Sequence, residues 1–169
     1  MKRLLLVALL APTPVAAEVK SSGAGHFEVE RKAVVNATPA EIHAQLGRIA
    51  EWWNPEHSYS GKAQNLRMDL QAGGCFCETL DGGGSIEHLR IVYADPANGV
   101  RATGGLGPLQ MEAVSGVLAW SFKRVEGGTE ITQNYYVSGS ARAGLEGYPA
   151  IVDGVLGQQF DRLVASLSK

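Results

Sequence analysis

Residues 149–169 read PAIVDGVLGQQFDRLVASLSK, and this stretch decides how the rest of the chain is arranged. Its apolar residues recur in steps of four and three, at Val152, Leu156, Phe160, Leu163 and Leu167. That spacing predicts an amphipathic helix with a single apolar stripe. Gly154 and Gly157 interrupt the helix, each at a cost of about 1 kcal/mol relative to Ala. Either they permit close packing on a sheet, or they leave room beside the helix for another molecule.

The chain before this helix alternates between apolar and polar residues with a period of two, which is typical of strands. Seven segments follow this pattern: residues 26–35, 66–70, 75–80, 86–94, 100–103, 113–125 and 129–138. Glycine clusters between several of them supply turn chemistry. Tyr135 and Tyr136 lie on opposite faces of the last strand, so one of them is expected to face inward.

The segment after the first strand has a helical pattern. Thr38 can serve as the N-cap, Pro39 as the first helical residue, and Glu41 completes a capping box. Apolar residues then repeat at helical spacing up to Trp52 and Trp53, and Asn54-Pro55 ends the pattern. Gly47 can divide the segment, so two short helices are expected.

This order of elements predicts an α+β fold in which a curved, seven-stranded antiparallel sheet wraps around the long C-terminal helix. The sheet must cover its concave face, and the C-terminal helix is the only long amphipathic element available for this. The two short helices hold one end open. We therefore expect a single domain over residues 26–169 that encloses a cavity and not a solid core.

The N-terminus has the order of features found in secretory signal peptides. Lys2 and Arg3 precede the apolar run Leu4–Ala11, and Val15-Ala16-Ala17 supplies small residues for a peptidase. The apolar run is too short to span a bilayer. We expect cleavage after Ala17, a periplasmic or secreted protein, and a flexible tail over residues 18–25. A membrane anchor or a buried strand is the alternative.

Charge excludes some classes of partner. Removing residues 1–17 takes away two basic residues and no acidic one, so the formal net charge changes from −2 to −4. Without clustered Lys and Arg, a mildly acidic chain is not expected to bind nucleic acid. The processed chain has no second long apolar segment, so no transmembrane helix is predicted in it. The sequence also indicates no cofactor.

Four stretches carry a resemblance to a known superfamily. They are VVNATPAEIHAQLGRIAEWW (34–53), LQAGGCFCETL (70–80), GGLGPLQMEAVSGVLAWSFKRVEGGTEITQNYYVSG (104–139) and VDGVLGQQFDRLVASL (152–167). In this order they resemble the SRPBCC or START-like superfamily of helix-grip proteins. That superfamily includes lipid-transfer domains, birch-pollen-allergen-like proteins, polyketide cyclases and heat-shock ATPase activator homologues. The resemblance covers about residues 26–168 and implies the helix-grip fold and a cavity. It does not imply one reaction, because its members bind, transport or cyclise their ligands.

Ten residues are candidates for the cavity wall. They are Trp52, Trp53, His57, Tyr59, Cys75, Cys77, His88, Met111, Trp120 and Phe160. The aromatic cluster at residues 52–59 can form a cavity rim with a polar anchor, or a hydrophobic plug that closes the sheet. The glycine-rich residues 104–110 lack the Lys and Ser/Thr of a phosphate-binding loop. They are interpreted as a mobile lid or as a simple strand connection.

Cys75 and Cys77 lie two residues apart on a strand, and their side chains therefore share a face. Three interpretations remain open: two buried thiols in the cavity wall, a disulfide, or half of a metal site completed by His57 or His88. A disulfide between such neighbours requires a local bulge or strain. A metal site is a weak interpretation without a second pair of cysteines, so no metal is predicted.

His88 shares a strand face with Ile86 and Arg90 in a regular alternation. It can act as a general base if an acidic neighbour supports it, or as a structural hydrogen-bonding group, which is the commoner role.

Three functions follow from this sequence. The first is binding or transport of a small hydrophobic molecule. The second is a cyclase- or hydrolase-like enzyme with His57 or His88 as acid or base. The third is a protein-interaction module, which a large apolar patch on the outer sheet face would favour.

Overall fold

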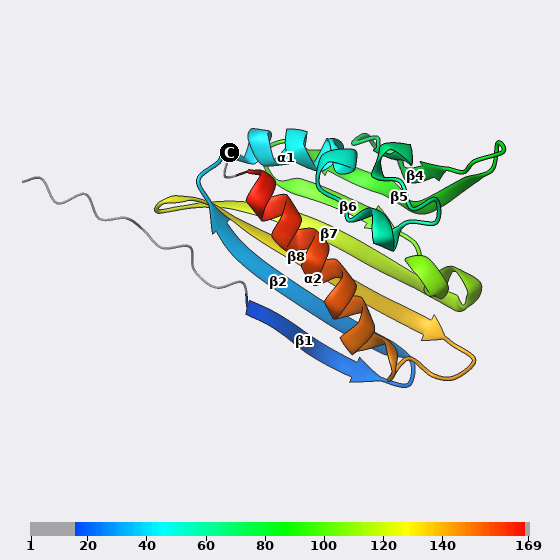
Figure 1. Ribbon diagram of the computed structural model, residues 1–169. Helices are drawn as coiled ribbons and strands as arrows, with labels where there is room; N and C mark the ends of the chain where they lie inside the picture. Colours follow the sequence, from blue (N-terminus) through cyan, green and yellow to red (C-terminus); the bar gives the residue numbers. More distant parts are fainter. Residues whose placement is uncertain (1–15, 168–169) are drawn as a thin grey trace, which may run out of the picture.

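The computed structural model describes residues 16–167, with secondary structure over most of this range (Figure 1). The strands are β1 (Ala16–Gly23), β2 (His26–Val35), β3 (Leu66–Met68), β4 (Cys75–Thr79), β5 (Ser85–Asp95), β6 (Gly99–Thr103), β7 (Ala113–Val125) and β8 (Gly128–Ser140). The α-helices are α1 (Pro39–Gly47) and α2 (Tyr148–Ser166). Four short 3-10 helices are η1 (Ile49–Glu51), η2 (Pro55–His57), η3 (Ala63–Asn65) and η4 (Gly107–Met111).

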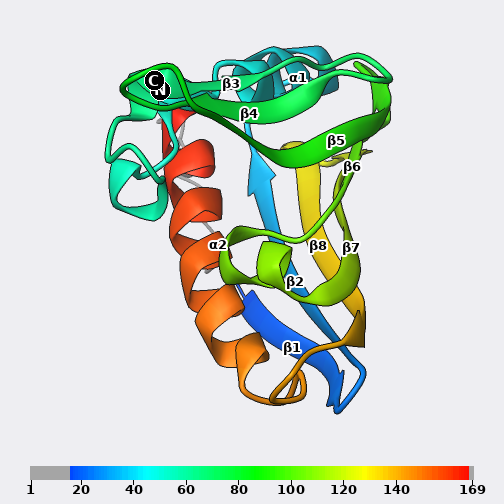
Figure 2. The ribbon, with the colours of Figure 1, turned by 90° about the vertical axis from the view of Figure 1, so that its right-hand side faces the viewer.

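The strands form one antiparallel sheet in the order β1-β2-β8-β7-β6-β5-β4-β3. The sheet curls around α2, which packs on β2 and β1 while β4 and β5 arch over the other end (Figure 2). This arrangement confirms the predicted α+β, helix-grip architecture. The core lies between the concave face of the sheet and the inward side of α2.

The eighth strand, β1, was not predicted, and the expected flexible tail at residues 18–25 is wrong. Most of these residues lie in β1, which pairs with β2 through partners such as Val19 with Val29. The side chains here are small or polar, but backbone hydrogen bonds hold the strand at the edge of the sheet, where polar residues are suitable. Cleavage after Ala17 would leave six residues of this strand, Glu18–Gly23. The predicted signal sequence before Ala16 lies outside the described residues.

The capping box at α1 is present as predicted. The Thr38 hydroxyl accepts a hydrogen bond from the Glu41 amide at 3.3 Å, and the Glu41 carboxylate accepts one from the Thr38 amide at 2.7 Å. The helix ends at Gly47, and 3-10 turns continue from Ile49. A single α-helix followed by short 3-10 helices therefore replaces the two short helices expected.

Gly157 allows α2 to approach the sheet closely. A Cβ there would lie 2.3 Å from the guanidinium of Arg31 on β2. That guanidinium makes an ion pair with the Asp153 carboxylate at 2.9 Å and donates to the Asp153 carbonyl at 3.0 Å. Gly154 differs, since a Cβ there would meet nothing within 4 Å. Of the two glycines, only Gly157 lies against a neighbouring side chain.

Candidate ligand-binding pocket

A pocket of about 480 Å³ lies beside the first half of α2. Its other walls are the segment from Trp53 to Tyr59, the loop from Leu106 to Leu109, and His88 of β5. Volumes of this size are typical of small-molecule sites. A pocket is therefore present at one end of α2, but the expectation of a cavity in place of a solid core is wrong elsewhere, because buried side chains fill the rest of the space between sheet and helix.

The α2 wall of the pocket is apolar. It consists of Tyr148, Ile151, Val152, Val155 and Leu156. These residues are spaced three or four apart or are adjacent, so they form one side of the first half of the helix. Ile151 remains 67% exposed and lies at the rim.

A buried tyrosine holds the opposite wall. The phenol of Tyr135 accepts a hydrogen bond from the Leu106 amide and donates one to the Gly104 carbonyl, both at 3.0 Å. Burial raises the pKa of Tyr135 to about 12, so the phenol keeps its proton and can donate. A Cβ on Gly116 would lie 2.6 Å from this ring, so a glycine there makes room for it. The loop is thus tied to β8 before η4 begins.

His88 and Glu78 form the polar end of the site. His88 Nε2 lies 2.9 Å from Glu78 Oε2, and both side chains are buried. The Glu78 carboxylate also accepts hydrogen bonds from the Tyr59 amide at 3.0 Å and the Ser60 amide at 2.5 Å. Glu78 therefore ties the segment after η2 to the sheet, and it positions the imidazole of His88.

The surroundings set the charges of this pair. Burial lowers the pKa of His88 and outweighs the opposing effect of Glu78, so the imidazole is neutral near pH 7. Burial raises the pKa of Glu78, but hydrogen bonds from Ser60, Tyr59 and His88 outweigh burial and leave the pKa below its ordinary value. An ionised carboxylate only accepts hydrogen bonds, so Nε2 of His88 carries the proton. His88 Nδ1 is then an acceptor without a partner among residues 16–167.

A β-bulge interrupts the alternation of β5 at His88. Phe76 pairs with Leu89 and Cys77 pairs with Glu87, so His88 is an extra residue on β5. In consequence His88 and Leu89 are both buried, although they are adjacent. The predicted face shared with Ile86 is retained, since Ile86 pairs with inward Glu78, but the face shared with Arg90 is wrong because regular alternation fails at a bulge.

His57 and Trp53 line the pocket from the side of η2. Trp53 Nε1 donates to the His57 carbonyl at 2.9 Å, and His57 Nδ1 lies 3.3 Å from Gln159 Nε2 of α2. Gln159 also accepts a hydrogen bond from the Asn54 amide at 2.7 Å. This buried glutamine fixes the η2 segment against α2, so the pocket has a defined shape on this side.

Of the predicted wall residues, the structure brings together Trp53, His57, Tyr59 and His88. Trp52, Trp120 and Phe160 do not line the pocket; each is at most 1% exposed and fills the core. Met111 is 75% exposed at the end of η4. The three buried residues belong to the core that fills the space between the sheet and α2, whereas Met111 points to solvent.

Cys75 and Cys77 also lie away from the pocket. The inward residues of β4 are Phe76 and Glu78, so the two cysteines point to the outer face of the sheet. They form a disulfide with a Cα–Cα distance of 5.4 Å, opposite the bulge at His88. The interpretations as buried thiols and as metal ligands are therefore wrong, because both need free sulfurs.

Sequence reasoning missed most of the α2 wall. Tyr148, Ile151 and Val155 lie outside the stripe that identified the helix. The available signal was a second set of apolar residues, at Ile151 and Val155, four residues apart on the same helix. Leu106 and Leu109 belong to the glycine-rich segment interpreted as a lid or a strand connection, and both line the pocket.

No known protein family and no curated protein matches this sequence. Among solved structures, an uncharacterized protein from Rhizobium leguminosarum has a TM-score of 0.61 at 16% identity, covering 92% of this chain and 98% of its own. Protein Ms6760 from Mycobacterium smegmatis has a TM-score of 0.58 at 15% identity, with 94% and 98% covered. Ara h 8.0201 has a TM-score of 0.55 at 14% identity, with 85% and 98% covered. At such identities these similarities show the helix-grip fold alone.

Proposed function

We propose that this protein binds a small, largely apolar molecule in the pocket beside α2. The observation that carries the proposal is a pocket of about 480 Å³ whose α2 wall consists of four aliphatic residues and Tyr148, with most of its polar groups on the other side. Apolar lining with a few placed polar groups is typical of small-molecule sites. None of the helices within residues 16–167 has the length and hydrophobicity to cross a bilayer.

The polar end indicates what the ligand carries. Neutral His88 offers Nδ1 as an acceptor, while Ser58 and Tyr59 contribute hydroxyl groups to the same pocket. A ligand with an apolar body and one hydroxyl or amide N–H donor would match both the α2 wall of the pocket and the acceptor on His88. A carboxylate is less suitable, since the Glu78 carboxylate lies directly behind His88.

The test is titration with N-phenyl-1-naphthylamine, a neutral apolar probe whose fluorescence rises when it leaves water. We expect saturable binding, and we expect V155W to reduce affinity at least tenfold because a bulky indole would occupy the pocket. V117W is the matched control, since Val117 lies on the outer sheet face and is 39% exposed. Equal binding by both variants would contradict the proposal.

The second candidate is a cyclase- or hydrolase-like enzyme, favoured by the buried pair of His88 and Glu78 at the pocket. A neutral imidazole held by a carboxylate is suited to general base catalysis. H88Q separates the two functions. A binding protein would keep its affinity for an apolar probe, and an enzyme would lose turnover of its substrate by about 100-fold or more while still binding it.

We also propose that the chain is exported. Its N-terminal residues have the order of a signal peptide, and a disulfide is expected in an oxidising compartment. Intact mass measurement of the protein isolated from a secreting host should give a chain beginning at Glu18. A mass that retains residues 1–17 would contradict export by cleavage.

A further inference from the structure

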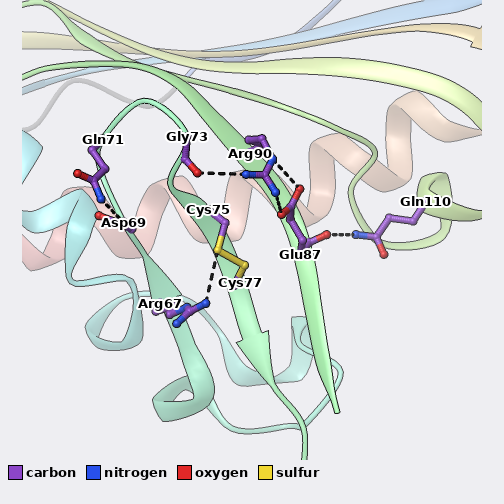
Figure 3. Close-up of a disulfide and its surroundings, with 9 residues drawn as sticks. All are labelled: Arg67, Asp69, Gln71, Gly73, Cys75, Cys77, Glu87, Arg90 and Gln110. Atoms are coloured by element: carbon purple, nitrogen blue, oxygen red, sulfur yellow. Dashed lines mark hydrogen bonds and ion pairs between the residues drawn. A yellow bond between two sulfur atoms is a disulfide. The ribbon is translucent and has the colours of Figure 1, made fainter.

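The Cys75–Cys77 disulfide lies in a groove on the outer face of β3, β4 and β5, away from the pocket (Figure 3). The groove has a volume of about 580 Å³, and its charged lining residues are Arg67 of β3, Asp69 just after β3, and Glu87 and Arg90 of β5. Both cysteines line it, so the bond is open to molecules that enter the groove.

The guanidinium of Arg67 lies close to one of the two disulfide sulfurs. Arg67 of β3 has its Nη2 atom 3.8 Å from Cys75 Sγ, and this guanidinium has no ion pair within the described part of the chain. Arg90 is held differently, since it pairs with Glu87 and donates to the Gly73 carbonyl at 3.1 Å. A positive charge near a sulfur stabilises the thiolate. Cys75 is therefore the better leaving group of the two.

Stabilisation of the fold does not explain this bond well. A disulfide stabilises by restricting the unfolded chain, and the effect shrinks with the length of the loop it closes. Cys75 and Cys77 are two residues apart, so the loop is close to the shortest possible. A bond that contributes so little as a crosslink is a candidate for chemistry.

The disulfide is also connected to the inner face of the sheet. Its Cα–Cα distance of 5.4 Å is shorter than the spacing of about 6.6 Å for the same step in a regular strand. Opposite this shortened step, β5 advances three residues, from Glu87 to Arg90. The bulge places Glu87 and Arg90 on the outer face, and His88 lies between them facing the pocket. Opening the disulfide would allow β4 to lengthen directly opposite His88.

We propose that Cys75–Cys77 is a site of thiol–disulfide exchange with a dithiol, and that its redox state is transmitted to His88 through the bulge. A thiolate of the dithiol attacks Cys77 Sγ, the S–S bond breaks, and Cys75 leaves as a thiolate beside Arg67. The second thiol of the partner then attacks the mixed disulfide and releases Cys77. Two electrons and two protons pass from the dithiol to the cysteines, and the partner leaves as a disulfide.

The first test measures exchange in the folded protein. Reduced dithiothreitol is added, thiols are trapped with a maleimide at intervals, and circular dichroism monitors folding. We expect complete reduction without unfolding, and we expect R67Q to slow it by about threefold because the leaving thiolate is less stabilised. R124Q is the matched control, since exposed Arg124 on β7 carries the same charge away from the disulfide. Reduction only on unfolding, or equal rates in both variants, would overturn the exchange site.

The second test measures transmission to His88 without any ligand, so failure of the proposed pocket function would not affect it. Histidine side-chain resonances are recorded for the oxidised and reduced protein and for C75S/C77S. We expect the His88 signals to shift on reduction, while those of His43 in α1 stay unchanged. An unchanged His88 signal in the reduced wild-type protein would overturn the transmission, whether or not the double variant folds.

Discussion

The two halves of α2 both carry apolar residues at helical spacing, but their surroundings differ. In the second half, Phe160 and Leu163 are fully buried under the sheet. In the first half, Ile151 is exposed, and Val152 and Val155 are only partly buried around the pocket. Both halves carry apolar residues at helical spacing, so the helix itself does not decide which half encloses a space. The neighbours decide, because the second half meets large core side chains and the first half faces a loop and the η2 segment.

The largest expected effect is a loss of stability on truncating a side chain in the second half of α2, where the core is filled. F160A removes an aromatic ring that is 0% exposed, and the core around it cannot fully collapse. We expect the free energy of unfolding to fall by about 3–5 kcal/mol. Urea denaturation followed by circular dichroism measures this.

I151A is the control from the open half of the same helix. Ile151 is 67% exposed, so this change should stay within about 0.5 kcal/mol of the wild type. Similar losses in the two variants would show that the halves do not differ in packing.

An intermediate effect is expected at the pocket wall. Y135F removes the hydroxyl that bonds the Gly104 carbonyl and the Leu106 amide. Leaving these part-buried partners unpaired should cost about 1–3 kcal/mol. Hydrogen exchange should also increase at the Leu106 amide while amides in the second half of α2 keep their protection. Y136F is the matched control, because Tyr136 points outward and is 41% exposed.

The smallest expected effect is on the pH dependence of stability, through His88 and Glu78 at the pocket beside the first half of α2. The pKa values of His88 and Glu78 are both lowered in the folded protein, burial being the dominant cause for His88 and hydrogen bonds prevailing over burial for Glu78. The unfolded chain therefore binds protons more readily at both residues, and stability falls as the pH falls. The His88 contribution begins to disappear near its ordinary pKa of 6.5, and that of Glu78 near 4.5.

H88Q should flatten the decrease in Tm between about pH 7 and pH 5, because the glutamine amide can still donate to Glu78 without titrating. Burial also lowers the pKa of His43, and this contribution remains in the variant. The difference between the wild type and H88Q therefore isolates His88. An unchanged pH profile in H88Q would show that this imidazole does not titrate differently in the folded and unfolded chains.

Much of the fold could be read from local patterns. Alternation located β2 and the strands from β3 to β8, and the capping box at Thr38 located the start of α1. The candidate site was predicted only in part. Trp53, His57 and Tyr59 follow one another closely in the chain, so their position on one rim depends on local structure. His88 joins the same pocket from the distant strand β5, where a bulge puts Arg90, two residues later, on the opposite face.

The sequence by itself determined the order of strands and helices, the amphipathic character of α2 and the close spacing of the two cysteines. These features depend on backbone periodicity and on capping groups, which act within a few residues. Only the tertiary structure decided that β1 joins the edge of the sheet, that Trp120 and Phe160 fill the core, and that the cysteines lie on the outer face as a disulfide. Packing between segments distant in the chain decides where space remains, and no local pattern records which surfaces will meet.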